Sequence, residues 1–277
     1  MPHRATIRVL SSLALVAGTV PTALRAQRSG DVDRWVQECR DGARDYGGRP
    51  RFCEVRDTGF RATGRAISVD PGENGGVSIS AWDRDSVAVS ARIQAQGQTE
   101  ADARSLAQQV RIETSDGTVR ADGPATSHRS SWSVSFVLLV PRRTDLTAEA
   151  VNGPIEVEGV KGRMQLTTRN GPVHLTEVGG DVHARTTNGP LVVTLAGDRW
   201  DGTGLDSETE NGPVTLTLPA NYAAHLVTGT VNGPLSIDFP ITVQGLISRH
   251  NIETDLNGGG PAIRAVTTNG PLAVRRR

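Results

Sequence analysis

The chain has 277 residues, enough for one long domain or two ordinary ones, with 31 glycines and only 4% aromatic residues. This composition favours many short strands and turns over a helical bundle. The formal net charge is zero, and the segment before Gln27 carries three arginines and no acid, so a chain that starts there has 27 basic against 30 acidic residues. A slightly acidic protein is not expected to bind nucleic acid.

The N-terminus has the pattern of a secretory signal peptide. Arg4 and Arg8 precede an apolar run from Val9 to Val20, and a short cleavage region follows. The run is shorter than the roughly 20 residues of a membrane-spanning helix. We therefore expect residues 1–26 to be removed, the mature chain to lack a transmembrane segment, and the protein to be exported to the periplasm or the extracellular space. An uncleaved membrane anchor is the alternative.

The chain has two cysteines, Cys39 and Cys53, close together in sequence. In an exported protein such a pair predicts a structural disulfide. No histidine stands near them, and two thiols alone make a poor metal site. A redox or metal role is therefore the weaker interpretation.

The residues around the cysteines predict one helix and one strand. Asp31 and Asp33 precede a short helix that runs to about Ala43. Residues 51–57 predict a strand that returns along it. We expect residues 27–59 to form a small N-terminal cap pinned by the disulfide.

Residues 60–142 predict an N-terminal β-region with one helix. Thr99 and Asp102 approximate a capping box ahead of an apolar helical face. Residues 115–118, Ser-Asp-Gly-Thr, predict a hairpin turn. Alternating apolar residues predict strands at 66–69, 77–79, 87–93 and 132–140, the last ended by Pro141.

Residues 143–277 are organised around a repeated Asn-Gly-Pro tripeptide. Successive copies are 18, 18, 23, 21 and 37 residues apart, which suits coils of 18 to 23 residues with one interruption. Residues 74–79 look like a degenerate earlier copy, and residues 239–262 break the pattern. The copies are Asn152-Gly153-Pro154, Asn170-Gly171-Pro172, Asn188-Gly189-Pro190, Asn211-Gly212-Pro213, Asn232-Gly233-Pro234 and Asn269-Gly270-Pro271.

Aligning the copies on their asparagines brings apolar residues into three columns. Five copies also have a threonine two residues before the asparagine. Apolar spacing of two on both sides of a turn indicates two strands per repeat, each with one face inside. The columns are Leu146, Met164, Val182, Leu205, Leu226 and Ile263; Ile155, Val173, Leu191, Val214, Leu235 and Leu272; and Val157, Leu175, Val193, Leu216, Ile237 and Val274.

The chemistry of the tripeptide predicts a corner. Asn tolerates left-handed backbone angles, Gly takes angles closed to other residues, and Pro fixes its own φ. Coils stacked at about 4.8 Å would place the Asn side chains above one another as an amide ladder. The sequence therefore predicts an all-β protein, a β-solenoid or β-helix-like stack of two-strand repeats, with one short helix and a disulfide-pinned cap in its N-terminal part.

Over residues 55–277 the chain resembles the bacterial "putative adhesin" domain-of-unknown-function family built from β-strand repeats. The resemblance rests on the Asn-Gly-Pro repeats with their preceding Thr, the strand from Trp132 to Pro141, the two early cysteines and the glycine run before the last repeat. Family members commonly have Asn-Gly-Gly at the turn. The resemblance implies a β-solenoid-like envelope protein, and the family has no established catalytic residues to carry over.

One group of acidic residues could carry chemistry. Asp206, Glu208 and Glu210 alternate, so their carboxylates should share one outer strand face. A spacing of about 6.6 to 6.8 Å is near that of inverting glycosidases, and clustered oxygens also suit Ca²⁺. The preceding repeat would place His183 opposite Asp206 and Arg185 opposite Glu208. Surface ion pairs are therefore the favoured interpretation.

Other chemistry has little support in the sequence. Trp200 and Tyr222 could stack on a sugar, although packing over an open edge is favoured. His174 and His183 lie in different columns and lack further metal-ligand types beside them. No phosphate-binding glycine loop, Gly-x-Ser-x-Gly motif or His-Glu-x-x-His motif occurs. We expect no catalytic residue, no cofactor and no metal.

The leading hypothesis is a non-catalytic, adhesin-like binding scaffold of the cell envelope, a monomer whose partner is a polysaccharide or protein. The first alternative is a polysaccharide-processing β-helix enzyme that uses Asp206, Glu208 and Glu210. The second is a structural element that self-associates through an uncapped last coil near Val274. Residues 275–277, all arginine, would oppose such stacking.

Overall fold

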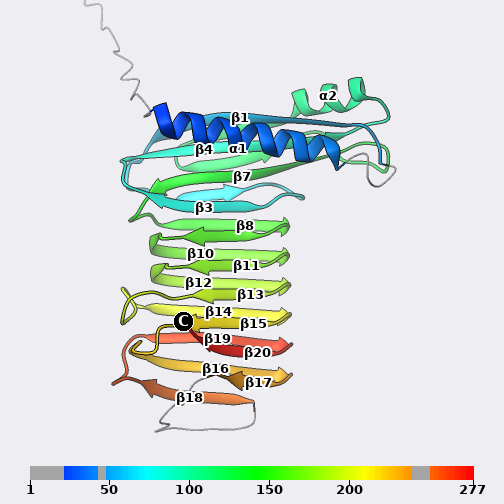
Figure 1. Ribbon diagram of the computed structural model, residues 1–277. Coiled ribbons are helices and arrows are strands. Elements are labelled where there is room, and N and C mark those ends of the chain that lie inside the picture. Colours follow the sequence, from blue (N-terminus) through cyan, green and yellow to red (C-terminus); the bar gives the residue numbers. More distant parts are fainter. Residues whose placement is uncertain (1–21, 43–47, 239–249) are drawn as a thin grey trace, which may run out of the picture.

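The computed structural model describes residues 22–42, 48–238 and 250–277, and it is built mostly from β-strands (Figure 1). Two ten-stranded sheets, here called sheet A and sheet B, share one hydrophobic core. Most of the predicted signal peptide, residues 1–21, lies outside the described residues.

Among the described helices, none combines the length and the apolar character needed to cross a membrane.

Sheet A begins with antiparallel strands and continues with parallel ones. The first three strands in its order pair antiparallel, and every later pair is parallel. Its order is β1 (Arg51–Arg61), β4 (Ser86–Gln96), β7 (Ser131–Pro141), β3 (Val77–Trp82), β9 (Ile155–Glu158), β11 (Val173–Thr176), β13 (Leu191–Thr194), β15 (Val214–Leu218), β20 (Leu272–Arg276) and β17 (Leu235–Ile237).

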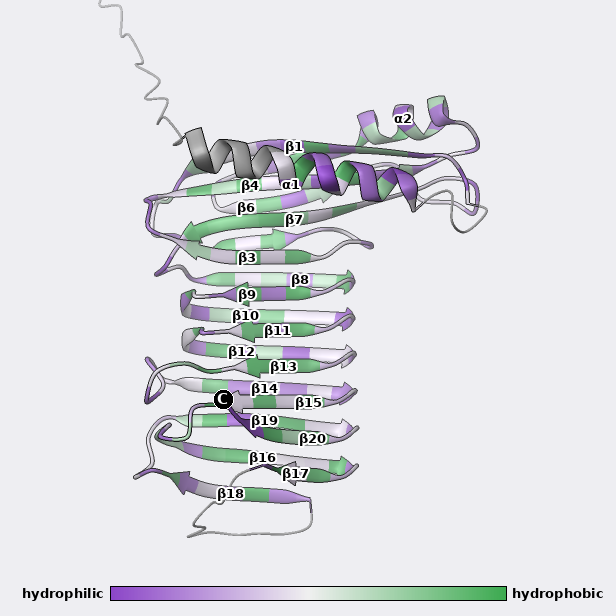
Figure 2. Cartoon of the chain, viewed as in Figure 1, coloured by the Kyte–Doolittle hydropathy of each residue, from purple (hydrophilic) through white to green (hydrophobic). Residues whose placement is uncertain are grey.

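Sheet B is parallel except for the strand pair at each end. Its order is β18 (Asn251–Leu256), β16 (Ala224–Asn232), β19 (Ala262–Asn269), β14 (Gly204–Asn211), β12 (Gly179–Asn188), β10 (Lys161–Asn170), β8 (Leu146–Asn152), β2 (Ile67–Asp70), β6 (Thr118–Asp122) and β5 (Arg111–Ser115). The strands of both sheets carry apolar residues at alternate positions (Figure 2).

The prediction of a β-solenoid or β-helix-like stack is wrong, because the strands form two large sheets whose order does not follow the chain. The last repeat, β19 and β20, lies between the repeat of β14 and β15 and that of β16 and β17. Strand β18 turns back antiparallel on β16, and the N-terminal part of sheet A is antiparallel. The coil near Val274 is therefore inside the sheet and not at its end. Because all repeats present similar apolar columns, the sequence pattern cannot specify which repeats are neighbours.

Within the parallel region, the strands join residues of the same column. Val182 lies between Met164 and Leu205, and Ile263 lies between Leu205 and Leu226. These side chains are at most 2% exposed. Burial of a full apolar side chain contributes about 1.5 to 3 kcal/mol, so the columns supply much of the stabilisation.

The asparagines form one continuous amide ladder along the corner edge. Each Nδ2 donates to the Oδ1 of the neighbouring asparagine, for example Asn188 to Asn170 at 2.9 Å. The ladder runs through Asn74, Asn152, Asn170, Asn188, Asn211, Asn269 and Asn232. Every amide in the series therefore satisfies its neighbour, which fixes the register of the corners.

Glycine is needed at the corners because neighbouring backbones pack closely there, and not because the backbone angles are unusual. None of the six corner asparagines and none of their glycines has a φ in the left-handed region, which corrects the sequence prediction. A Cβ on Gly189 would instead overlap the carbonyl oxygen of Gly171, and the other corners repeat this approach. The same oxygen accepts a hydrogen bond from buried Thr186 at 2.9 Å. The position of this carbonyl therefore explains both residues: it leaves no room for a Cβ on the glycine, and it accepts the hydrogen bond of the threonine.

The N-terminal cap contains the disulfide and a longer helix than expected. Cys39 and Cys53 are bonded, and helix α1 spans Thr22–Asp41, so it begins before Asp31. In Figure 1 it lies across β1 and β4. The Arg92 guanidinium on β4 lies 5.7 Å from the Trp35 ring of α1, a cation–π contact that joins helix to sheet.

A second helix closes the N-terminal end of the core. Helix α2 (Glu100–Gln109) has the capping box formed by Thr99 and Asp102, which confirms the sequence prediction. It buries Ala103, Leu106 and Ala107. The hairpin turn before β6 is also confirmed, since Asp116 and Gly117 both have a positive φ.

Replacing Gly189 by Ala should lower the free energy of unfolding by about 3 kcal/mol, because the new methyl group overlaps buried backbone. Gly30→Ala is the matched control, since the helical Gly30 has open space around it and Ala favours a helix by up to about 1 kcal/mol. Urea denaturation of the two variants checks this, and equal stabilities would contradict it.

Candidate functional site

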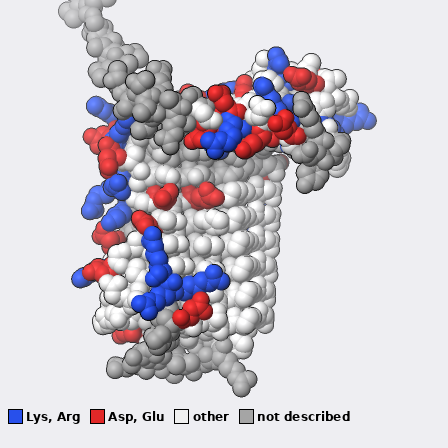
Figure 3. Space-filling view, viewed as in Figure 1, with Lys and Arg blue, Asp and Glu red and all other residues white. Residues whose placement is uncertain are grey.

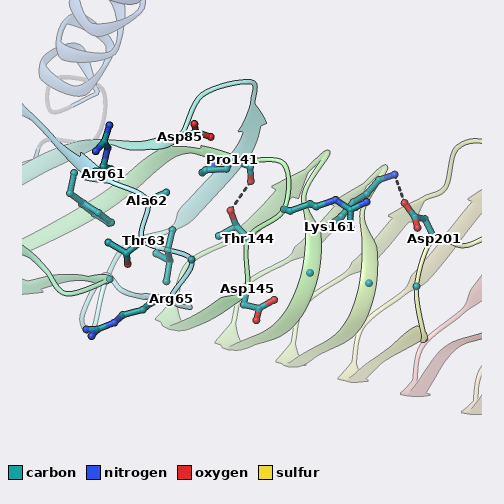
Figure 4. Close-up of a pocket in the computed structure, with 18 residues that line it drawn as sticks. Arg61, Ala62, Thr63, Arg65, Asp85, Pro141, Thr144, Asp145, Lys161 and Asp201 are labelled. Carbon is teal, nitrogen blue, oxygen red and sulfur yellow. Dashed lines mark hydrogen bonds and ion pairs between the residues drawn. The ribbon is translucent and has the colours of Figure 1, made fainter. Parts of the chain in front are cut away.

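The main candidate site is a hollow of about 720 Å³, here called the edge pocket, on the edge opposite the Asn-Gly-Pro corners (Figure 4). It lies where the antiparallel N-terminal strands meet the first parallel repeats. A cavity of this size holds a small organic ligand or one to two sugar units. It is lined by Phe60, Arg61, Ala62, Thr63, Gly64, Arg65, Ile67, Asp85, Gly117, Pro141, Arg143, Thr144, Asp145, Lys161, Gly162, Gly180, Asp201 and Gly202.

Apolar side chains and bare backbone form part of its wall. Ile67 belongs to the hydrophobic core cluster, and the partly buried Phe60 packs against that cluster. Gly162 and Gly180 have positive φ, and a Cβ on Gly180 would overlap the backbone of Gly162. This side of the pocket is therefore lined by backbone. The Gly180 amide already donates to Asp201, and the Gly180 oxygen accepts from Thr203 and Trp200.

Charged side chains surround this wall. Arg61 and Arg65 lie on one side of the pocket, and Lys161 and Asp201 lie on the other (Figure 4). Lys161 Nζ is 2.6 Å from Asp201 Oδ2. The hydrogen bond and charge of Lys161, with a smaller contribution from Arg143, lower the pKa of the Asp201 carboxyl.

Several lining charges already have partners within the protein. Asp145 Oδ1 accepts a hydrogen bond from the Arg163 amide at 2.8 Å, and Arg65 lies 4.0 Å from Asp116. Within the described ranges, Arg61 and Arg143 form no ion pair, and both are exposed. Two guanidinium groups of the pocket are therefore available to an anionic ligand.

The acidic residues singled out from the sequence lie elsewhere, on the outward face of sheet B. Asp206 and Glu208 are half-buried and Glu210 is exposed. The expected cross-strand neighbours are present, with His183 Nδ1 at 3.8 Å from Asp206 and Arg185 Nη2 at 3.7 Å from Glu208. These distances are long for hydrogen bonds.

A residue that the sequence reasoning missed holds the two carboxylates together. Arg264 Nη1 lies 2.5 Å from Asp206 Oδ1 and 3.3 Å from Glu208 Oε2. Burial alone would lower the pKa of Arg264, but its hydrogen bonds and charge interactions with Asp206 and then Glu208 raise it. Arg264 stands in the same alignment column as Asp206. It was missed because β19 was expected at the end of the stack and not beside β14.

This geometry gives both carboxylates one shared cation. A glycosidase acid must instead have a raised pKa so that it carries a proton near neutral pH. Here both carboxylates lie against the guanidinium of Arg264, which occupies the space between them. The arrangement is thus that of a structural ion-pair network.

A second ionic cluster fastens the edge strand β18. His225 Nδ1 lies 2.8 Å from Asp255 Oδ1, and His225 Nε2 lies 3.4 Å from Glu253 Oε1. The Asp255 hydrogen bond is the main cause that raises the pKa of His225. The protonated imidazole therefore stabilises the attachment of β18 to β16.

The remaining candidates are packing residues or are isolated. Trp200 and Tyr222 are 3% and 2% exposed, so they pack in the core and do not offer rings to a sugar. Trp200 Nε1 donates to the Gly180 oxygen at 2.9 Å, and burial raises the pKa of Tyr222 to about 12. Across the described part of the chain, no group of three or more His, Cys, Asp or Glu residues is placed to hold a metal ion.

Several solved structures are similar to this chain. A "putative cell adhesion protein" from Clostridium sporogenes has 9% identity and a TM-score of 0.45, with 82% of this chain and 100% of that chain covered. A "putative adhesin" from Bacteroides fragilis has 7% identity and a TM-score of 0.37, with 81% and 97% covered. A "putative lipid binding protein" from Parabacteroides distasonis has 10% identity and a TM-score of 0.32, with 80% and 96% covered.

No protein-family model matches the sequence, and no curated protein matches it. Two of the similar structures are named for adhesion, as is the family that the sequence motifs resemble.

Replacing Arg264 by Gln should lower the melting temperature more than replacing Arg185 by Gln. Arg264 lies 2.5 Å from Asp206 and 3.3 Å from Glu208, whereas Arg185 is 60% exposed and lies 3.7 Å from Glu208 alone. The two variants should differ in free energy of unfolding by about 1 kcal/mol, because both arginines are partly exposed to solvent. Differential scanning calorimetry at low salt measures it, and a larger loss from Arg185→Gln would be the contrary result.

The contribution of His225 to stability should depend on pH. Because its folded-state pKa is raised, the stabilisation relative to His225→Gln is complete below the unfolded pKa of about 6.5 and fades as the pH rises through the higher folded pKa. Melting temperatures of both proteins between about pH 5 and pH 9 test this. In an Asp255→Asn background the pH dependence should largely vanish, and its full persistence would refute the assignment.

Proposed function

We propose that this protein is an exported, non-catalytic binding scaffold of the cell envelope, and that its edge pocket binds an anionic group on an envelope polysaccharide. The observation that carries the proposal is the pair of arginines, Arg61 and Arg143, that line the pocket without a salt bridge among the described residues. Arg143 interacts with Asp201 only through a weaker charge interaction. Arginine forms paired hydrogen bonds with carboxylate and phosphate groups.

The composition of the pocket supports a sugar carrying an acid. Half-buried Phe60 and Pro141 offer apolar surface to the less polar face of a ring. The Thr63 hydroxyl offers a polar group for a sugar hydroxyl. Thr144, by contrast, already donates its hydroxyl to the Pro141 oxygen at 2.6 Å, which holds the turn.

Export is supported by the N-terminal pattern of residues 1–26 and by the Cys39–Cys53 disulfide. A non-catalytic role is supported by the shared Arg264, which keeps Asp206 and Glu208 in an ion-pair network. The competing role is a polysaccharide-processing enzyme. A glycan turnover that disappears in Glu208→Gln would favour that enzyme and remove the proposal.

The double substitution Arg61→Ala/Arg143→Ala should weaken binding of an oligogalacturonate probe at least about tenfold, since a hydrogen bond to a charged group contributes about 1.5 to 3 kcal/mol. The fully methyl-esterified oligomer, which lacks the charge, should bind both proteins equally weakly. Isothermal titration calorimetry measures both affinities.

The matched control is Arg129→Ala/Arg169→Ala, which removes the same charge from exposed positions outside the pocket. It should bind the acidic oligomer like the unsubstituted protein. An equal loss in this control would assign binding to net charge alone, and no binding of oligogalacturonate by the unsubstituted protein would reject an acidic sugar as the ligand class.

A further inference from the structure

The outward surface of sheet A between β3 and β17, here called the A face, is a regular array of small and charged side chains. Two outward columns cross its seven strands. The first is Ser78, Glu156, His174, Val192, Thr215, Ala273 and Ser236, and the second is Ser80, Glu158, Thr176, Thr194, Thr217, Arg275 and Asp238.

Charges of opposite sign lie toward opposite ends of this face. Glu156 and Glu158 are on β9, and Arg275 is on β20. Figure 3 shows an acidic group nearer the N-terminal strands on this side of the molecule, and a mainly basic group with acidic neighbours nearer the other end. Strand β13 stands midway, because β9 is two strands from it on one side and β20 is two strands from it on the other.

The end charges are poorly neutralised within the chain. Among described residues Glu158 has no ion-pair partner, and it is exposed. Arg275 Nε reaches only to 4.0 Å from Asp238, and both side chains are more than half exposed. Glu156 lies 3.8 Å from His174, a partner that is charged only when protonated.

We propose that the A face binds the A face of a second copy of this chain, about a two-fold axis that runs along β13. Such an axis keeps each column opposite itself and exchanges strands at equal distance from β13. Glu158 then faces Arg275 of the second copy, and Thr176 faces Thr217. Val192 and Thr194 each face the same residue of the second copy, so only small side chains meet at the centre of the contact.

The rest of the face is compatible with this arrangement. The same operation places Ser80 opposite Asp238 and His174 opposite Thr215, so no like charges meet directly. Strand β17 faces β3 of the second copy. Strands β7, β4 and β1 therefore face no strand of the second copy. Helix α1, which lies across β1 and β4, therefore extends past the facing strands of the second copy (Figure 1).

The size of the face makes this a weak dimer. Seven strands at about 4.8 Å give a strip roughly 30 Å long and two side chains wide. The buried total is below about 1,000 Å², the range of transient contacts. Association should therefore depend on protein concentration and weaken with salt, because the Glu158–Arg275 pairs lie at the rim.

Single cysteines test the axis directly. The two native cysteines are bonded to each other, so an introduced cysteine is the only free thiol. Val192→Cys should form a covalent dimer under mild oxidation or with a short bis-maleimide. Thr217→Cys alone should react poorly, and a mixture of Thr217→Cys with Thr176→Cys should link efficiently. Preferential self-linking of Thr217→Cys would overturn the proposed axis.

Charge exchange supplies an independent measurement. Glu158→Arg and Arg275→Glu should each shift sedimentation toward monomer by at least about tenfold in dissociation constant, and the double variant should recover the dimer. A strict monomer up to about 1 mM, or a dimer unaffected by either exchange, would reject the proposal. The Arg61→Ala/Arg143→Ala protein should dimerise normally, so this result is separate from that of the edge pocket.

Discussion

The close approach of backbone at the Asn-Gly-Pro corners is the constraint on which the structure depends. At each corner a glycine packs against the carbonyl of the neighbouring glycine, and an asparagine amide bonds the next asparagine. At five of the six corners a threonine hydroxyl also donates to that carbonyl, and the corner at Asn152 has Ala150 instead. No side chain can enter this stack. Strands on both sides of the corner are therefore held in one register, and the apolar columns follow from it.

In both sheets the apolar columns point into the core, so the side chains available to a partner lie on the outward faces. On sheet B, Arg264 pairs with Asp206 and Glu208, and Arg163 lies 3.7 Å from Asp181 on the next strand. On sheet A, Glu158 is exposed without a salt bridge among the described residues, and Arg275 lies 4.0 Å from Asp238.

The edge pocket occurs where the repetition stops. Neighbouring parallel strands leave little room between them, but the chain segment after β1 and the turn between β7 and β8 depart from the sheets and enclose a hollow. The disulfide, α1 and α2 stabilise this N-terminal part, and α2 closes the end of the core with Leu106 and Ala107. Rigid neighbours of this kind can hold arginines around a ligand without a large entropic cost on binding.

The sequence by itself determined the local elements: the Cys39–Cys53 bond, the capping box at Thr99, and the outward position of Asp206 and Glu208. These follow from short-range chemistry and from the period of two along a strand. It could not determine that β19 lies beside β14, because repeats with equivalent columns are interchangeable by pattern alone. Only the tertiary structure placed Arg264 between two carboxylates and brought Arg61 and Arg143 to one pocket. Only the tertiary structure also showed that the corner glycines are required because neighbouring backbones approach closely. Each of these features depends on residues that are far apart in the chain.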